Sequence, residues 1–182
     1  MYAEFIMNLI SMPRLASADF LIKPKMQISR QQKLDLTRVA DHIYLGAIRL
    51  SAEYSLLKEN NIKYVLNLTN SILQIDRNCD IVCLNQALNS EDFCSLMKLI
   101  PKCVSFIDKA IQEKKNIAIC CRDGYSKTFV ILAAYYILKS NQDYQTVCDD
   151  LKMSIPEFSY WSGTKYENSL NQMHNIIKGN NH

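Results

Sequence analysis

The sequence predicts an α/β fold in which helices flank a central, mostly parallel and twisted sheet. Two stretches of the chain carry this prediction. Residues 50–69 combine apolar residues at helical spacing, an Asn-Asn break and an apolar strand, which is the pattern of a strand–helix–strand unit in a parallel sheet. Residues 117–138 combine a short apolar strand, a polar loop and an apolar run that favours a helix. A loop between a central strand and a buried helix turns backbone N–H groups toward one point, so it is a candidate anion-binding site.

The first half of the chain has strand signals on both sides of one helical segment. Residues 39–46 have the composition of a strand and end in a glycine. Apolar residues recur at helical spacing over residues 50–59, where we expect a helix. Strands are expected over residues 62–69 and 81–84, because both are short apolar runs between polar segments.

The second half is dominated by helical periodicity. Residues 93–113 place their apolar side chains on one face, and Pro101 within this segment is expected to kink the helix or to split it. Residues 129–138 are apolar throughout and should form a central buried helix. A further helix is expected over residues 143–153, and a Thr-x-x-Glu capping box opens a last one over residues 164–177.

Length and composition indicate one globular domain. The chain has 182 residues, enough to bury a normal core. We expect the domain to span residues 31–178, between an N-terminal extension of residues 1–30 and a C-terminal tail of residues 179–182. Hydrophobic residues make up 48% and charged residues 21% of the chain, which is typical of a soluble domain. The net charge of +3 comes without basic residues interleaved with aromatics, so we expect no nucleic-acid partner.

The cysteines and the apolar runs predict the compartment. There are seven cysteines and no signal-peptide pattern, which favours reduced thiols in a cytoplasmic or nuclear protein. No run reaches the roughly 18 apolar residues of a membrane span, so no membrane partner is expected. Cys79 and Cys83 lack a second pair of ligands, and we therefore expect neither a metal site nor a cofactor.

The loop that begins at Cys121 carries the candidate chemistry. Cys121 ends the strand, so its sulfur should lie at the floor of a cradle of N–H groups, with Arg122 and Lys127 nearby. These groups favour the thiolate and should lower the thiol pKa. A thiolate beneath a bound phosphate can act as a nucleophile in phosphoryl transfer. The alternative is a buried strand and a turn without chemistry, in which cysteine serves as a small apolar residue. The residues expected to bind phosphate are Arg122, Asp123, Gly124, Tyr125, Ser126, Lys127 and Thr128.

This loop resembles the signature of the cysteine-based dual-specificity protein phosphatases. In that family His-Cys is followed by five residues, then Arg, then Ser or Thr. The spacing fits, as do Gly124, Ser126 and Thr128. Two positions depart from the pattern: Cys120 stands in place of the histidine, and Lys127 in place of the arginine.

The resemblance extends beyond the loop, over about residues 36–178. Ile-Tyr-Leu-Gly at residues 43–46 is similar to the end of the family's opening hairpin, and residues 62–69 resemble one of its strands. The match is weaker at residues 159–163, where the family has a Pro-Asn segment. The resemblance implies a dual-specificity phosphatase-like fold with the phosphate-binding loop between a central strand and a buried helix.

The family also implies a general acid, an aspartate in the loop before the helix that leads to the signature strand. Counting back along the chain places Asn89 or Ser90 at that position, and neither donates a proton as a carboxylic acid does. Glu91 and Asp92 are the nearby candidates for general acid. The alternative is that they are solvated residues near a helix N-terminus, where negative charge is favourable.

These features leave three functional hypotheses open. The first is a pseudophosphatase, weak or inactive as an enzyme, that binds phosphorylated protein (phosphotyrosine or phosphothreonine) or a kinase or phosphatase partner. The second is an active dual-specificity phosphatase that works through a phosphorylated Cys121. The third, with little basic charge to support it, is dephosphorylation of RNA or a phosphoinositide. We expect Cys120 to fill the core, and the expected resolving partners of an oxidised Cys121 are Cys83, Cys94 and Cys103.

Overall fold

The computed structural model describes most of the predicted domain. The described residues are 36–47, 54–73, 75, 79–89, 92–140, 142–155, 158 and 165–179. The predicted N-terminal extension, the candidate positions Ser90 and Glu91, the weakly matching segment 159–163 and the start of the last capping box at Thr164 lie outside these ranges.

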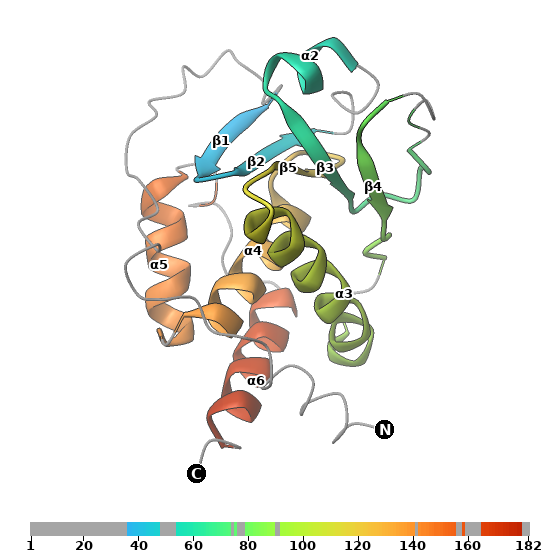
Figure 1. The fold of residues 1–182 in the computed structure, drawn as a ribbon. Helices are drawn as coiled ribbons and strands as arrows, with labels where there is room; N and C mark the ends of the chain where they lie inside the picture. The colour runs from blue at the N-terminus through green and yellow to red at the C-terminus, as the bar shows by residue number, and fades with distance from the viewer. Residues whose placement is uncertain are drawn as a thin grey trace.

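The described strands form one five-stranded sheet in the order β1-β2-β5-β3-β4 (Figure 1). Strands β1 and β2 form an antiparallel hairpin, whereas β2–β5, β5–β3 and β3–β4 are parallel pairs. The prediction of a mostly parallel sheet is therefore confirmed. The strands are β1 (Thr37–Ala40), β2 (Ile43–Ala47), β3 (Ile62–Asn67), β4 (Val82–Asn85) and β5 (Asn116–Cys121).

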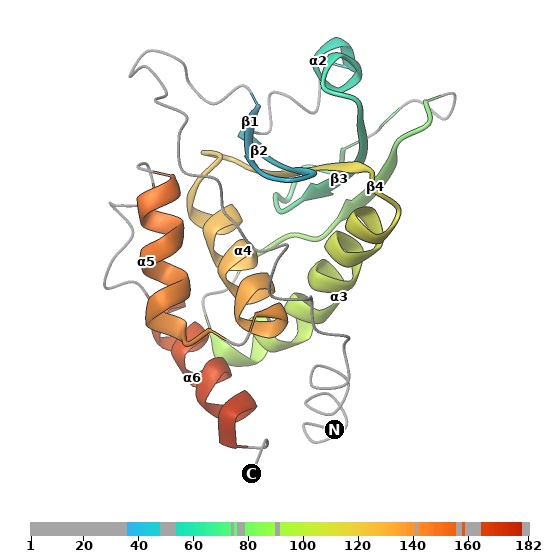
Figure 2. The same cartoon turned by 60° about the vertical axis from the view of Figure 1, so that its left-hand side comes forward.

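Helices cover both faces of the sheet. Figures 1 and 2 show α2 on one side and α3, α4, α5 and α6 on the other. The helices are α2 (Tyr54–Glu59), α3 (Phe93–Gln112), α4 (Ser126–Lys139), α5 (Tyr144–Ser154) and α6 (Lys165–Gly179). The helices predicted before and after the signature loop are thus present. In the described part of the chain, no helix has the length and apolar character needed to cross a bilayer.

Helix α3 continues through Pro101 as one element, so the alternative of two separate helices is wrong. Proline removes one backbone hydrogen bond from a helix interior. The apolar face of α3 is buried on both sides of Pro101, from Leu96 to Ile107, and this packing holds the helix together across the lost bond. Asp92 caps its N-terminus by accepting a hydrogen bond from the Ser95 N–H at 2.9 Å.

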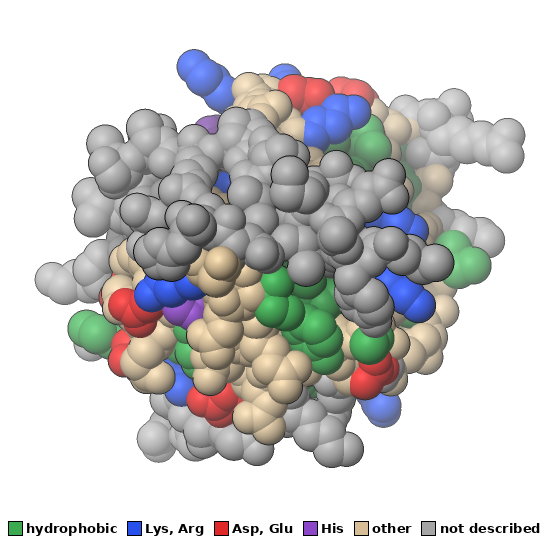
Figure 3. All heavy atoms as spheres, turned by 90° about the horizontal axis from the view of Figure 1, so that it is seen from below, with side chains coloured by type: hydrophobic (Ala, Val, Ile, Leu, Met, Phe, Trp, Pro, Cys, Tyr) green, Lys and Arg blue, Asp and Glu red, His purple; other side chains and the backbone are tan. Residues whose placement is uncertain are grey.

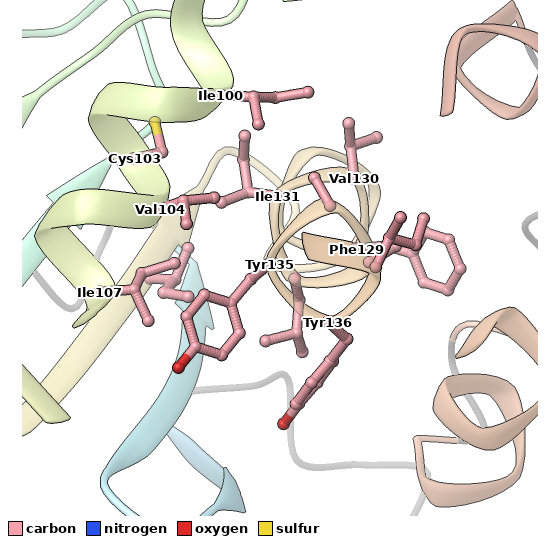
Figure 4. Packing of buried hydrophobic residues seen from close by; sticks show 14 of the residues in the cluster. Ile100, Cys103, Val104, Ile107, Phe129, Val130, Ile131, Tyr135 and Tyr136 are labelled. Atoms are coloured by element: carbon pink, nitrogen blue, oxygen red, sulfur yellow. The ribbon is translucent and has the colours of Figure 1, made fainter. Parts of the chain in front are cut away.

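Helix α4 is the centre of the larger core. It packs against α3, α5, α6 and strand β5, and every side chain from Thr128 to Lys139 is buried. On one side its residues meet α3; Figure 4 shows the α3 side chains Ile100, Cys103, Val104 and Ile107 beside Ile131 and Tyr135. On another side Phe129 packs edge-to-face on Phe158, with ring centroids 4.8 Å apart. A smaller core on the α2 side contains Leu57, Ile62, Val65, Ala118 and Cys120.

One buried residue of α4 is charged. The Lys139 side chain is only 1% exposed and forms an ion pair with Asp108 of α3, whose side chain is 13% exposed. A buried ammonium is tolerated only when it is paired, so this pair fixes the last turn of α4 against α3.

The face of the molecule seen in Figure 3 carries mixed acidic and basic side chains around a hydrophobic area.

Candidate active site

The site lies where β5 ends at Cys121 and α4 begins at Ser126. The connecting loop requires glycine, because Gly124 has a φ of +83°, in the left-handed region that other residues adopt only at a cost. Space is restricted as well. A Cβ atom at Gly124 would lie 3.3 Å from the Ala47 nitrogen and 3.3 Å from the Gly46 carbonyl carbon. The loop is therefore held closely against the end of β2.

Gly124→Ala should lower the free energy of unfolding by about 2 kcal/mol, because alanine is strained at this φ and its Cβ is crowded by backbone atoms. Urea unfolding of the full chain measures this change. Gly179→Ala is the matched control, since a Cβ atom there meets nothing within 4 Å, and it should change stability by less than about 0.5 kcal/mol. Equal effects of the two substitutions would contradict this account of the loop.

The Cys121 sulfur lies at the base of the loop. Its side chain is fully buried, and the backbone N–H groups of Lys127 and Thr128 form hydrogen bonds to it. The Thr128 hydroxyl donates to the carbonyl oxygens of Gly124 (2.8 Å) and Tyr125 (2.9 Å). That hydroxyl therefore closes the loop from within.

The Asp123 carboxylate occupies the mouth of the loop. Its Oδ1 accepts hydrogen bonds from the Cys121 thiol at 3.0 Å, the Tyr125 N–H at 2.9 Å and the Ser126 N–H at 3.1 Å. Its Oδ2 accepts from the Ser126 hydroxyl at 2.6 Å. Burial alone would raise the pKa of Asp123, but the hydrogen bonds from Cys121, Ser126 and the loop amides outweigh it and lower the pKa to about 2.

The expectation of a low thiol pKa is wrong for this loop. Burial, followed by the hydrogen bond to Asp123 and the negative charge of that carboxylate, raises the pKa of Cys121 to about 11. The amides of Thr128 and Lys127 act in the opposite direction but do not prevail. The prediction counted the two nearby cations and overlooked the carboxylate. Arg122 is exposed and Lys127 is partly buried.

Two of the other cysteines lie on the opposite face of the sheet from Cys121. Cys120 points into the smaller core, on the opposite side of the sheet from Cys121, and burial raises its pKa to about 12. Cys83 packs against that same smaller core, so as a resolving partner of Cys121 it lies on the wrong face. Cys94 is exposed at the start of α3, Cys103 is buried within α3, and all seven cysteines are free thiols. Within the described ranges no three His, Cys, Asp or Glu side chains come together as a metal site.

Of the residues considered for the general acid, the structure describes Asn89 and Asp92. Asn89 is exposed, and Asp92 is the N-cap of α3. Sequence reasoning missed the contact between Asp123 and the thiol. A local signal could have found it: Asp123 precedes Ser126 by three residues, the spacing at which a carboxylate accepts from the amide of a starting helix.

The fold and this site together define a class of protein. A buried cysteine that ends a central parallel strand, followed by a glycine turn and the N-terminus of a buried helix, is the architecture of the cysteine-based phosphatases. The sequence model described as "Dual specificity phosphatase, catalytic domain" matches residues 43–176. The chain belongs to the dual specificity phosphatase family.

Curated relatives and solved structures agree with this assignment. The chain is 29% identical over 157 residues to dual specificity protein phosphatase 8 of Mus musculus, covering 81% of this chain and 24% of that protein. It is 30% identical over 141 residues to the Homo sapiens protein of the same name, covering 74% of this chain and 22% of the relative. The chain thus spans about a quarter of the length of these relatives.

Among solved structures, the fold is similar to that of a leucine rich repeat and phosphatase domain containing protein from Entamoeba histolytica. The TM-score is 0.66 at 20% sequence identity, over 82% of this chain and 97% of that one. The predictions of family and fold class are confirmed.

Proposed function

We propose that this protein is a phosphatase-fold binding protein that holds the phosphorylated side chain of a partner protein in the loop of residues 121–128 and turns it over weakly or not at all. The observation that carries the proposal is the hydrogen bond from the Cys121 thiol to the Asp123 carboxylate at 3.0 Å. With a pKa of about 11, only about one thiol in 10⁴ is ionised at pH 7. The thiolate is the nucleophile in this chemistry, so the reactive form is scarce.

The composition of the loop also supports weak turnover. Lys127 stands where the family has arginine. Lysine keeps the positive charge but lacks the planar fork that holds two phosphate oxygens at once. The loss of one preorganised donor to a transition state typically costs about 10²–10³-fold in rate.

The general acid is the other weak point. Asn89 or Ser90 stands where the family has an aspartate, and a general acid typically contributes about 10²–10⁴-fold. Glu91 and Asp92 are the nearby carboxylic acids. We assign Asp92 to the capping of α3, because its carboxylate already accepts a hydrogen bond from the first turn of that helix.

The features needed for binding an anion are retained. The N–H groups of the loop, the N-terminus of α4 and the ammonium of Lys127 all favour a negatively charged group. The family acts on phosphorylated proteins, so phosphotyrosine or phosphothreonine in a kinase, a phosphatase or another signalling protein is the partner we propose. We place this function in the cytoplasm or nucleus, where free thiols like those found here persist.

The alternative is an active dual-specificity phosphatase, and family membership favours it. In that reaction the Cys121 sulfur attacks phosphorus and forms an S–P bond. The alcohol leaves with a proton, and water then cleaves the S–P bond to release phosphate. The amides of Lys127 and Thr128, which already bond to the sulfur, would help to stabilise the thiolate.

Two measurements on the full chain distinguish the proposals. We expect the parent protein to hydrolyse para-nitrophenyl phosphate slowly, at a rate close to that of Cys121→Ser. We also expect it to bind phosphotyrosine or phosphothreonine peptides more tightly than the same peptides without phosphate. Turnover that is fast in the parent and absent in Cys121→Ser would establish the enzyme instead. Equal binding of phosphorylated and plain peptides would overturn the binding function.

A further inference from the structure

The donors that an anion would use in this loop are already engaged. Two backbone N–H groups, of Tyr125 and Ser126, and the Ser126 hydroxyl all donate to Asp123. The Cys121 thiol donates to the same carboxylate. A carboxylate resembles part of a phosphate group in charge and in its acceptor oxygens. Asp123 therefore makes, within the chain, the contacts that an incoming phosphate would need.

A phosphate and the carboxylate cannot both fit favourably. A phosphoryl group above the Cys121 sulfur would meet an oxygen that lies 3.0 Å from that sulfur. The charges are alike, so each disfavours the other. The low pKa of Asp123, about 2, keeps the carboxylate charged at any physiological pH, and protonation does not relieve the conflict.

We propose that Asp123 is an internal competitor for the anion site, whose carboxylate must turn away from Cys121 before a phosphorylated residue can bind. Asp123 thereby sets both the affinity of the loop for oxyanions and the reactivity of the thiol. This inference rests on the proposed phosphate-binding function and adds a residue that limits it.

The simpler account is that Asp123 only stabilises the turn that precedes α4, and the chain contains a comparison for that account. Asp143, the N-cap of α5, accepts hydrogen bonds at the same i, i+3 spacing: its Oδ1 accepts from the Thr146 N–H at 2.9 Å and its Oδ2 from the Thr146 hydroxyl at 2.8 Å. What distinguishes Asp123 is the additional thiol donor and its position over the base of the loop. Asp143→Ala is therefore a matched control that removes a similar set of hydrogen bonds beyond the opposite end of α4.

The experiment uses tungstate, a tetrahedral oxyanion like phosphate, in calorimetric titrations of the full chain. Asp123→Ala should lower the dissociation constant for tungstate by about tenfold or more, because it removes both the competing oxygens and their charge. Asp123→Asn keeps an acceptor oxygen without the charge and should give a smaller gain. Asp143→Ala should leave the dissociation constant at the parent value.

A second measurement follows the thiol itself. The rate of Cys121 alkylation by iodoacetamide at pH 7, read by peptide mass mapping, should rise about 10–100-fold in Asp123→Ala, because a thiol freed from the carboxylate ionises more readily. In the parent the rate should increase with pH through about 11, whereas in Asp123→Ala the midpoint should fall. Asp143→Ala should alkylate like the parent.

Each outcome has one meaning. If the parent binds tungstate as tightly as Asp123→Ala, Asp123 does not compete with anions, while the proposal that the loop binds anions is supported. If no variant binds tungstate, the anion site and the competitor fail together, whatever the alkylation rates. If alkylation is unchanged in Asp123→Ala, the carboxylate does not hold the thiol and the inference is wrong. Should Asp123→Ala unfold by circular dichroism, Asp123→Asn, which preserves size and an acceptor oxygen, decides the same questions.

Discussion

Asp123→Ala combined with Lys127→Arg should raise kcat/KM for para-nitrophenyl phosphate by at least about 10³-fold over the parent. The leaving group of this substrate departs without a general acid, so the proposed function attributes its slow turnover to two causes, Lys127 in place of arginine and the raised pKa of Cys121. Restoring the guanidinium fork should recover about 10²–10³-fold. Removing the hydrogen bond and the charge of Asp123 should lower the thiol pKa part of the way from about 11, because burial remains, and should increase the thiolate fraction at pH 7 by about tenfold. Each single substitution should give an intermediate rate.

The controls for this gain lie in the same chain. Adding Cys121→Ser to the double variant should abolish the turnover, because a serine hydroxyl is a far weaker nucleophile than a thiolate. Lys102→Arg, an exposed lysine on α3, makes the same chemical change elsewhere and should have no effect. A double variant that remains as slow as the parent would show that the barrier lies elsewhere than in the clamp and the thiol.

A phosphothreonine peptide tests the remaining deficit. Its alkoxide leaving group requires a proton, so the double variant should hydrolyse it poorly. Adding Asn89→Asp should increase that rate by about 10²-fold or more if Asn89 occupies the acid position, while the aryl substrate changes little. An equal increase in the rates of hydrolysis of both substrates would argue against an acid role at position 89.

The sheet and the loop could be predicted because their signals are local. Short apolar runs such as residues 62–69 and 117–121 predict buried strands from the local sequence alone. The polar break around Gly124 predicts the turn between strand and helix. A glycine at a strand-to-helix turn often indicates a positive φ, and Gly124 has one. For these features, residue type and spacing determine the conformation almost without help from the rest of the fold.

The features that the sequence did not predict, the thiol pKa and the position of Cys83, depend on the direction in which side chains point. Arg122, Asp123 and Lys127 are all near Cys121 along the chain, but only the structure shows that the carboxylate turns toward the sulfur. A count of nearby charges therefore gave the wrong sign for the thiol pKa. Cys83 failed as a resolving partner for a similar reason, since a change of one residue in strand register moves a side chain to the opposite face of the sheet.

Lys139 shows the same limit in the core. The apolar run that predicts α4 ends at Leu138, and a lysine after it has the pattern of a solvated helix end. Instead the last turn of α4 is covered by α3, and Asp108 meets the ammonium there. Periodicity places α3 and α4 individually, but it does not say which of their charged residues face each other.

Asp108→Ala should therefore lower the free energy of unfolding by about 3–5 kcal/mol, since it removes the carboxylate that pairs with the buried Lys139 ammonium. Such a loss is a large share of the roughly 5–15 kcal/mol that stabilises a typical domain, and urea or guanidinium unfolding would detect it readily.

The cost comes mainly from keeping the Lys139 charge buried without the Asp108 carboxylate, so Asp108→Leu combined with Lys139→Met should be far less destabilising than Asp108→Ala alone. The exposed pair of Arg38 and Asp41, whose charged groups lie 2.8 Å apart, supplies the comparison: Arg38→Ala should cost less than about 1 kcal/mol, because water replaces the partner. If Asp108→Ala proved as mild as Arg38→Ala, water or another acceptor would have to reach the Lys139 ammonium, and the pair would not be what holds the end of α4 against α3.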